Sequence, residues 1–185
     1  MSGLLQQRMT VDEYLVWAEG RAGRYELYNG VVYAMAPERA AHAETKHAVA
    51  NALSAAIAKA KLDCWMLPDG MTVRVDSNTA HEPDALVYCG AKLPSDAIEV
   101  PDPVIVVEVL SPSTRHIDAS AKLAGYFTLP SVHHYLIIDA EKRLVIHHAR
   151  AEADLISTRL AHKGTLALDP PGLRVAVARL FGSAR

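Results

Sequence analysis

Two carboxylates stand where a folded chain must give them a special role. Glu108 interrupts the apolar run Val104–Leu110, whose composition is typical of a central strand covered on both faces. A carboxylate in such a strand must be neutralised, paired with a cation or bound to a metal. Asp84 follows Pro83 and opens a second strand-like run, Asp84–Tyr88, and the residues between the two runs allow a loop that returns the chain. We therefore predict that Asp84 and Glu108 lie on neighbouring strands.

Two carboxylates held side by side repel each other, which raises one pKa unless a divalent cation lies between them. Oxygen ligands suit Mg²⁺ or Mn²⁺ better than they suit zinc. We predict an acidic, metal-binding site with Asp84 and Glu108 as ligands. On spacing alone there is an alternative, in which Asp84 caps the start of its strand and Glu108 forms a salt bridge with a nearby Lys or Arg.

Turn chemistry and hydrophobic spacing predict the elements that position this pair. A capping-box pattern at Thr10–Glu13 begins a short helix. Asn29-Gly30 joins two β-rich runs into an N-terminal hairpin, and apolar residues recur at helical spacing through Ala41–Lys61. Strands are predicted at 25–28, 31–35, 64–67, 71–75, 84–88, 104–110, 133–138, 143–148, 155–160 and 173–177, and a second helix at about 116–127. The order of elements predicts an α/β (α+β) fold with a mixed central sheet flanked by helices, in one domain spanning residues 1–185.

Composition limits the function classes only weakly. The chain has 185 residues and a net charge of -2, so a nucleic-acid partner needs a local basic patch. The most apolar run is too short to span a bilayer, so we expect no membrane segment. Cys64 and Cys89 form no C-x-x-C pair and lie beside apolar residues. We expect both to be reduced packing residues of a cytoplasmic protein.

An ordered set of residues resembles a known family. Pro83-Asp84, the run Glu108–Thr114, and then Asp118, Lys122 and Tyr126, preceded by Arg24–Gly30, are similar to the Uma-type "putative restriction endonuclease" family of the PD-(D/E)XK nuclease superfamily. The similarity covers almost the whole chain. It implies a restriction-endonuclease-like fold and a metal-dependent endonuclease that hydrolyses nucleic-acid phosphodiester bonds, with DNA as the expected partner. It also implies a homodimer, because nucleases of this superfamily often pair their sites to cut both strands.

The resemblance assigns roles residue by residue. Asp84 matches the Asp of the Pro-Asp motif, and Glu108 matches the acid of the (D/E)-x-K motif. Leu110 stands where that motif has its lysine, which would lie on the same side of the strand as Glu108. The resemblance gives this cation to Lys122 of the following helix. The alternative for Lys122 is an ordinary surface ion pair with Asp118, four residues before it.

Glu26 matches a glutamate that precedes the Asn-Gly turn in the family, and it is a third acidic catalytic candidate. Strand alternation also allows Glu26 to be a solvent-facing residue. Tyr126 shares a helix stripe with Asp118 and Lys122, so it either lines the cleft or packs, and Asp118 is at most a supporting residue. His42 matches a histidine near the start of the long helix, although a satisfied core or surface histidine is the more common interpretation.

A separate group of histidines, His133-His134 and His147-His148, brackets the turn at Asp139–Lys142. If Ile138 pairs with Leu144, His134 falls opposite His148, near enough to share a metal. No Cys or carboxylate within the two pairs completes a tetrahedral site. We therefore favour exposed histidines on an edge hairpin over a zinc site.

A non-catalytic module is the competing class of function. In that hypothesis the nuclease fold serves binding or assembly, and Glu108 and Lys122 form a buried ion pair. The absence of lysine at Leu110 and the near-neutral overall charge support it. The cations available to a nucleic-acid backbone are scattered along the sequence: Arg24, Lys46, Arg74 and Arg115.

Overall fold

The computed structural model describes residues 8–110, 119–152 and 155–182. Its helices are α1 (Val11–Ala18), α2 (Ala40–Ala60), α3 (Ala119–Thr128) and the 3-10 helix η3 (Val177–Phe181). Its strands are β1 (Tyr25–Tyr28), β2 (Val31–Ala34), β3 (Cys64–Pro68), β4 (Val73–Arg74), β5 (Ala80–His81), β6 (Ala85–Cys89), β7 (Pro103–Val109), β8 (His134–Asp139), β9 (Leu144–Arg150), β10 (Ile156–Ala161), β11 (Thr165–Leu168) and β12 (Leu173–Ala176).

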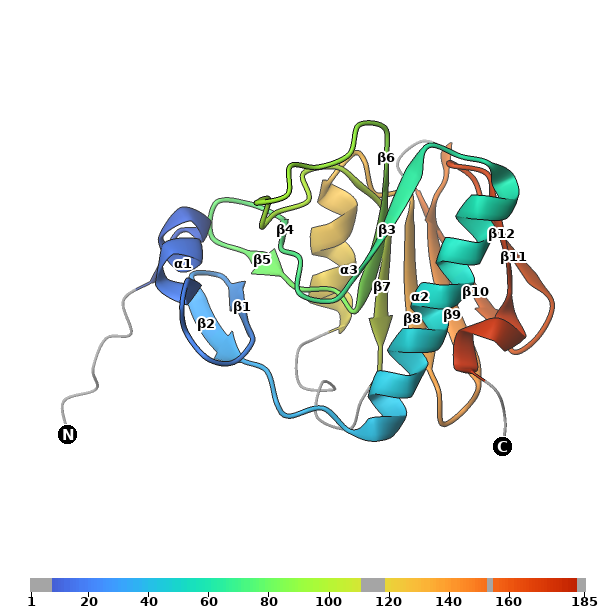
Figure 1. Cartoon of the computed structure of the whole chain (residues 1–185), viewed down its shortest axis with the longest axis horizontal. Helices are drawn as coiled ribbons and strands as arrows, with labels where there is room; N and C mark the ends of the chain where they lie inside the picture. The colour runs from blue at the N-terminus through green and yellow to red at the C-terminus, as the bar shows by residue number, and fades with distance from the viewer. Residues whose placement is uncertain (1–7, 111–118, 153–154, 183–185) are drawn as a thin grey trace.

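A six-stranded sheet in the order β10-β9-β8-β7-β6-β3 forms the centre of the molecule. Strand β7 runs parallel to β8 and antiparallel to β6. Helix α2 covers one face of this sheet and α3 covers the other (Figure 1). Side chains of β7 alternate between the two layers, with Ile105 and Val107 packing on the α2 side and Val106 on the α3 side. The predicted mixed sheet flanked by helices is confirmed.

The predicted N-terminal hairpin is present and belongs to a second, smaller sheet. Strands β1 and β2 pair around Asn29 and Gly30, whose φ values of 49° and 78° are those that the turn requires. This sheet has the order β2-β1-β5-β4. Helix α1 begins with the predicted capping box, in which the Thr10 N–H donates to Glu13 at 2.8 Å and the Glu13 N–H donates to the Thr10 hydroxyl at 3.3 Å.

The hairpin β11–β12 and η3 pack on the α2 side of the molecule. Sequence patterns predicted β12 but treated residues 161–172 as a loop, and β11 lies inside that range. Its four residues pair with β12 and alternate between exposed and buried, although the run leads directly into the Pro170-Pro171-Gly172 turn. The first residues of the predicted helix at 116–127 lie outside the described part of the chain.

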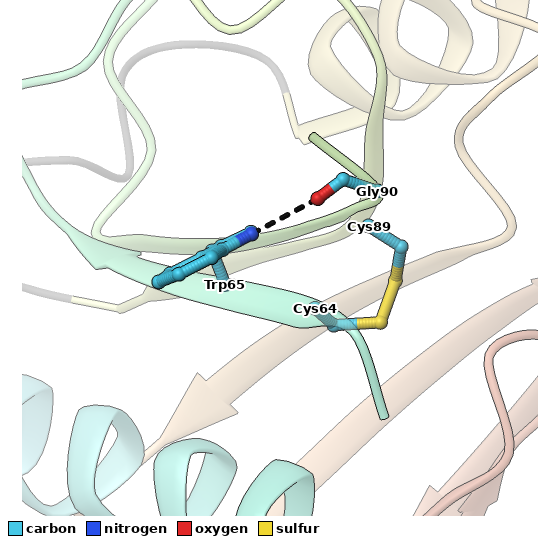
Figure 2. The surroundings of a disulfide bond; sticks show 4 residues. All are labelled: Cys64, Trp65, Cys89 and Gly90. Carbon is cyan, nitrogen blue, oxygen red and sulfur yellow. Dashed lines mark hydrogen bonds between the residues drawn. A yellow bond between two sulfur atoms is a disulfide. The ribbon is translucent and has the colours of Figure 1, made fainter. Parts of the chain in front are cut away.

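The expectation of two reduced cysteines is wrong. Cys64 and Cys89 form a disulfide bond, shown in Figure 2 beside the hydrogen bond from the Trp65 indole to the Gly90 carbonyl. The two cysteines are 25 positions apart in sequence, but the antiparallel register of β3 and β6 places them directly opposite each other. The cysteines therefore no longer support a cytoplasmic location. None of the helices in the described residues is both long and apolar enough to cross a membrane.

Candidate active site

Asp84 and Glu108 come together at one end of the central sheet. Ala85 of β6 pairs with Val107 of β7 in antiparallel register. Asp84 directly precedes Ala85 and Glu108 directly follows Val107, so the same register sets the two residues opposite each other. This pairing explains why Asp84 and Glu108 are neighbours although they lie far apart in the sequence.

Glu108 points into the α3 layer, where two side chains of α3 meet it. The Lys122 ammonium lies 2.9 Å from Glu108 Oε1, and the Tyr126 hydroxyl donates to the same oxygen at 3.0 Å. Burial raises the pKa of Glu108 to about 7, because the lowering effect of Lys122 is offset by the carboxylates of Glu26 and Asp84. Tyr126 is fully buried, and burial together with Glu108 raises its pKa. The sequence left open whether Tyr126 lines the cleft or only packs, and its hydroxyl contacts the Glu108 carboxylate.

Glu26 is the second partner of Lys122. It lies on β1, is 2% exposed, and accepts a hydrogen bond from the Lys122 ammonium at 2.8 Å and from the Glu82 N–H at 3.1 Å. The alternative of a solvent-facing Glu26 is therefore wrong. Burial raises the pKa of Glu26, but His81 and Lys122 outweigh it and lower that pKa to about 2.

Lys122 is held between two carboxylates from different elements. It is 9% exposed, so the alternative of an ordinary pair on the helix surface is also wrong. Burial disfavours the ammonium form, but Glu108 and Glu26 outweigh this effect and raise the pKa of Lys122. Lys122 is therefore charged throughout the neutral range. Asp118, the other member of the surface alternative, lies outside the described residues.

Asp84 is oriented from the opposite side, by β7 and α2. Its Oδ2 accepts a hydrogen bond from the Val109 N–H at 2.7 Å and lies 3.5 Å from His42 Nε2. His42 Nε2 also contacts the Val109 carbonyl at 2.9 Å, and its Nδ1 lies 2.6 Å from Glu38. Burial lowers the pKa of His42, but Asp84 and Glu38 outweigh it and raise that pKa to about 9. His42 is therefore an imidazolium near neutral pH.

A ring of further charges surrounds Asp84, and sequence reasoning missed most of it. Lys46 pairs with Glu38 and, at 2.5 Å, with Asp69, and its ammonium lies 3.8 Å from Asp84 Oδ1. Arg24 pairs with Asp69 at 2.5 Å and with Glu82 at 3.1 Å. Glu38 had a usable signal, because it precedes His42 by four residues. Asp69 and Glu82 lie in connecting segments with no periodic pattern.

Asp84 and Glu108 each keep one carboxylate oxygen that accepts no hydrogen bond from the described residues. Asp84 Oδ2 and Glu108 Oε1 are each engaged by hydrogen bonds, whereas Asp84 Oδ1 and Glu108 Oε2 accept none from the described residues. Ligand atoms of Glu38, His42 and Asp84 also lie within 4.8 Å of one another. Both nitrogens of His42 already have partners, so this second group binds a metal only after His42 loses a proton. The carboxylate pair has the donor chemistry that Mg²⁺ and Mn²⁺ prefer.

The histidine group on β8 and β9 differs from the prediction. Asp139, rather than Ile138, pairs with Leu144, which places His134 opposite Ala149. His134 instead contacts His147, with 2.9 Å between Nδ1 and Nε2. Burial lowers the pKa of both rings to about 4. The expectation of exposed histidines on an edge hairpin is wrong, because both rings are buried and β10 covers the far side of β9.

Comparisons with known proteins place the chain in a family. The family described as "Uma2: Putative restriction endonuclease" matches residues 11–178. The chain belongs to this family. It is also similar to a Synechocystis protein described as "Uncharacterized protein slr1290", with 25% identity over 179 residues, 94% of this chain and 92% of that protein.

A solved structure shares the fold of this Uma2-family chain. It is described as a "putative nuclease belonging to DUF820" from Anabaena variabilis, and it superimposes with a TM-score of 0.76 at 14% sequence identity. The match covers 94% of this chain and 97% of that chain. The predicted membership of the Uma-type family and the restriction-endonuclease-like fold are confirmed.

Proposed function

We propose that this Uma2-family protein is an endonuclease that hydrolyses nucleic-acid phosphodiester bonds with the help of Mg²⁺ or Mn²⁺. One observation carries the proposal. Asp84, directly before β6, stands opposite Glu108 of β7 in the sheet register, and the Lys122 ammonium lies 2.9 Å from Glu108. Paired carboxylates beside a buried lysine supply both ligands for a hard cation and a fixed positive charge for a phosphate.

Each residue has a distinct role in this proposal. Asp84 and Glu108 would hold the metal, which when bound lowers the pKa of a water molecule and polarises a phosphoryl oxygen. Lys122 places a positive charge beside the phosphate, and Glu26 fixes the position of that charge from the hairpin. The Val109 N–H and the His42 imidazolium orient the Asp84 carboxylate. Tyr126 holds Glu108 by its hydroxyl.

Cleavage of DNA tests the proposal directly. Plasmid and single-stranded DNA are incubated with the purified protein in Mg²⁺ or Mn²⁺, beside Asp84→Asn and a matched control, Asp102→Asn, which removes an exposed carboxylate from the β6–β7 connection. We expect Asp84→Asn to lose about 100-fold or more of the cleavage rate and Asp102→Asn to lose none. Equal cleavage by Asp84→Asn and the wild type refutes the assigned site.

A non-catalytic binding module is the second candidate. The contact between Glu108 and Lys122 favours it, because a buried ion pair needs no metal to satisfy the carboxylate. Thermal denaturation with added Mn²⁺ separates the two candidates, since a ligand that binds the folded state raises its stability. No stabilisation, together with no cleavage of any substrate, supports the module. The homodimer remains a prediction, and analytical ultracentrifugation would measure it.

A further inference from the structure

A groove of about 500 Å³ lies between the C-terminal half of α2 and the β11–β12 hairpin with η3. Most of its lining residues are small, and three long cations, Lys59, Arg174 and Arg179, line it as well. No acidic or aromatic side chain is among its lining residues, which are Ala52, Ala55, Ala56, Lys59, Ala60, Thr165, Gly172, Arg174, Val175, Ala176 and Arg179. The charged residues that line the groove are therefore all positive.

The three cations of the groove differ from those beside the acidic site. Arg24, Lys46 and Arg74, which the sequence offered as contacts for a nucleic-acid backbone, are all tied to carboxylates. Lys59, Arg174 and Arg179 are exposed, and their side chains form no hydrogen bond or ion pair within residues 8–110, 119–152 and 155–182. The groove therefore holds three exposed cations that carry no ion pair within the described residues, whereas Arg24 and Lys46 beside Asp84 are neutralised by carboxylates.

We propose that this groove binds the sugar–phosphate backbone of the nucleic acid that the acidic site cleaves, an inference that rests on the proposed function. Three convergent cations without a carboxylate fit a chain of phosphates. The small alanine side chains and Gly172, which has none, let a backbone approach closely. The lining residues include no aromatic ring on which a base could stack, so we assign the groove to the sugar–phosphate backbone, a contact that positions the substrate.

Helix α2 connects the groove to the acidic site. His42, near its first turn, contacts Asp84, and Lys59, in its last turn, lines the groove. These two residues lie about 25 Å apart along the helix axis, at a rise of about 1.5 Å per residue. That length corresponds to about seven nucleotide steps of a duplex strand. A duplex of one to two turns is therefore long enough to reach both places.

Equilibrium binding without metal tests the groove separately from catalysis. The probe is a fluorescein-labelled duplex of about 20 base pairs, and the readout is fluorescence anisotropy in EDTA across a series of KCl concentrations. The proteins are the full chain, Lys59→Ala, Arg174→Ala, Arg179→Ala and the triple variant. Lys92→Ala is the matched control, because it removes one exposed cation outside the groove. Circular dichroism verifies that each variant is folded.

We expect each single variant to reduce the slope of log affinity against log salt by about 0.9, and the triple variant by about 2.7. Each lost contact weakens binding by about fivefold to tenfold near 0.1 M salt. Lys92→Ala keeps the wild-type slope. A triple variant with the affinity and slope of the wild type overturns the inference, and the single variants decide the matter if the triple variant does not fold.

Competition with ATP and inorganic phosphate identifies the ligand. If either displaces the duplex at a concentration close to the duplex Kd, the groove is a site for small phosphates and the proposed backbone contact is wrong. The nuclease proposal fails independently of this result. Absence of cleavage together with groove-dependent binding refutes only the nuclease, whereas Asp84-dependent cleavage with groove-independent binding refutes only the groove.

Discussion

Lys122 is the residue whose substitution tests the site most sharply. Its ammonium lies 2.8 Å from Glu26 and 2.9 Å from Glu108, and the residue is 9% exposed. Lys122→Met keeps an unbranched side chain of similar length and removes the charge. Two buried carboxylates then face each other without a cation, which is the costly way to break a buried ion pair.

The cost depends on pH, and its sign follows from proton binding. Without Lys122, burial and the carboxylates of Glu26 and Asp84 raise the pKa of Glu108 in the folded state still further above the unfolded value of about 4.3. The folded variant then binds more protons than the unfolded chain, so its stability falls as the pH rises above that value. We expect Lys122→Met to lower the free energy of unfolding by about 3–5 kcal/mol at about pH 8, and by less at about pH 5.

Urea denaturation followed by circular dichroism at both pH values measures this effect. The control is Lys122→Met combined with Glu26→Gln and Glu108→Gln, which removes the two charges together. It should recover most of the lost stability, because replacing all members of a buried ionic group costs little. A loss below about 1 kcal/mol at about pH 8, or a loss equal at both pH values, refutes the conclusion that Lys122 neutralises this pair.

Three further predictions concern neighbouring features. Burial raises the pKa of Glu108 to about 7, so a proton competes with Mn²⁺ for this carboxylate below that pH. Mn²⁺ affinity measured by calorimetry should therefore fall about tenfold per pH unit below about pH 7. Constant affinity down to about pH 5 excludes Glu108 as a ligand. Tyr126→Phe removes the hydroxyl that donates to Glu108 at 3.0 Å. Urea denaturation should show a free energy of unfolding lower by about 1.5–3 kcal/mol. An unchanged denaturation midpoint contradicts a stabilising role for this hydrogen bond. Reduction of the Cys64–Cys89 disulfide, which spans 25 positions, should lower the free energy of unfolding by about 3 kcal/mol. Thermal denaturation with and without dithiothreitol measures this loss, and Cys64→Ser/Cys89→Ser is the control that does not respond to the reductant. An unchanged wild-type midpoint in dithiothreitol contradicts the prediction.

Much of the fold follows from local patterns in the sequence. The capping box at Thr10, the turn at Asn29-Gly30 and the apolar spacing of α2 each have a local physical cause, and each element lies where it was predicted. The short strand β5 was missed because two residues cannot display a period, and β11 was missed because it lies in the connection that contains the Pro170-Pro171-Gly172 turn. The disulfide was missed for a different reason: only the register of β3 against β6 brings Cys64 and Cys89 together.

The candidate site could be predicted only in part. One misplaced charge, Glu108, was enough to place Asp84 beside it, since a carboxylate in an apolar strand demands compensation. Lys122 came from the family resemblance alone, because nothing in its own helix shows that it faces Glu108 rather than solvent. His81, which is 1% exposed and lies 3.8 Å from Glu26, was missed because its role depends on the contact between β5 and β1.

The position of the cation changes what holds the site together. A lysine at Leu110 would lie on β7 with Glu108, and one strand would supply both charges. Here the ammonium comes from α3, and its second partner, Glu26, comes from β1 in the smaller sheet. Lys122 therefore reaches both of its carboxylate partners only when the hairpin, α3 and the central sheet have all packed together. The same ion pair serves the catalytic and the structural hypothesis, so loss of cleavage in a Lys122 variant has meaning only when its stability is measured alongside.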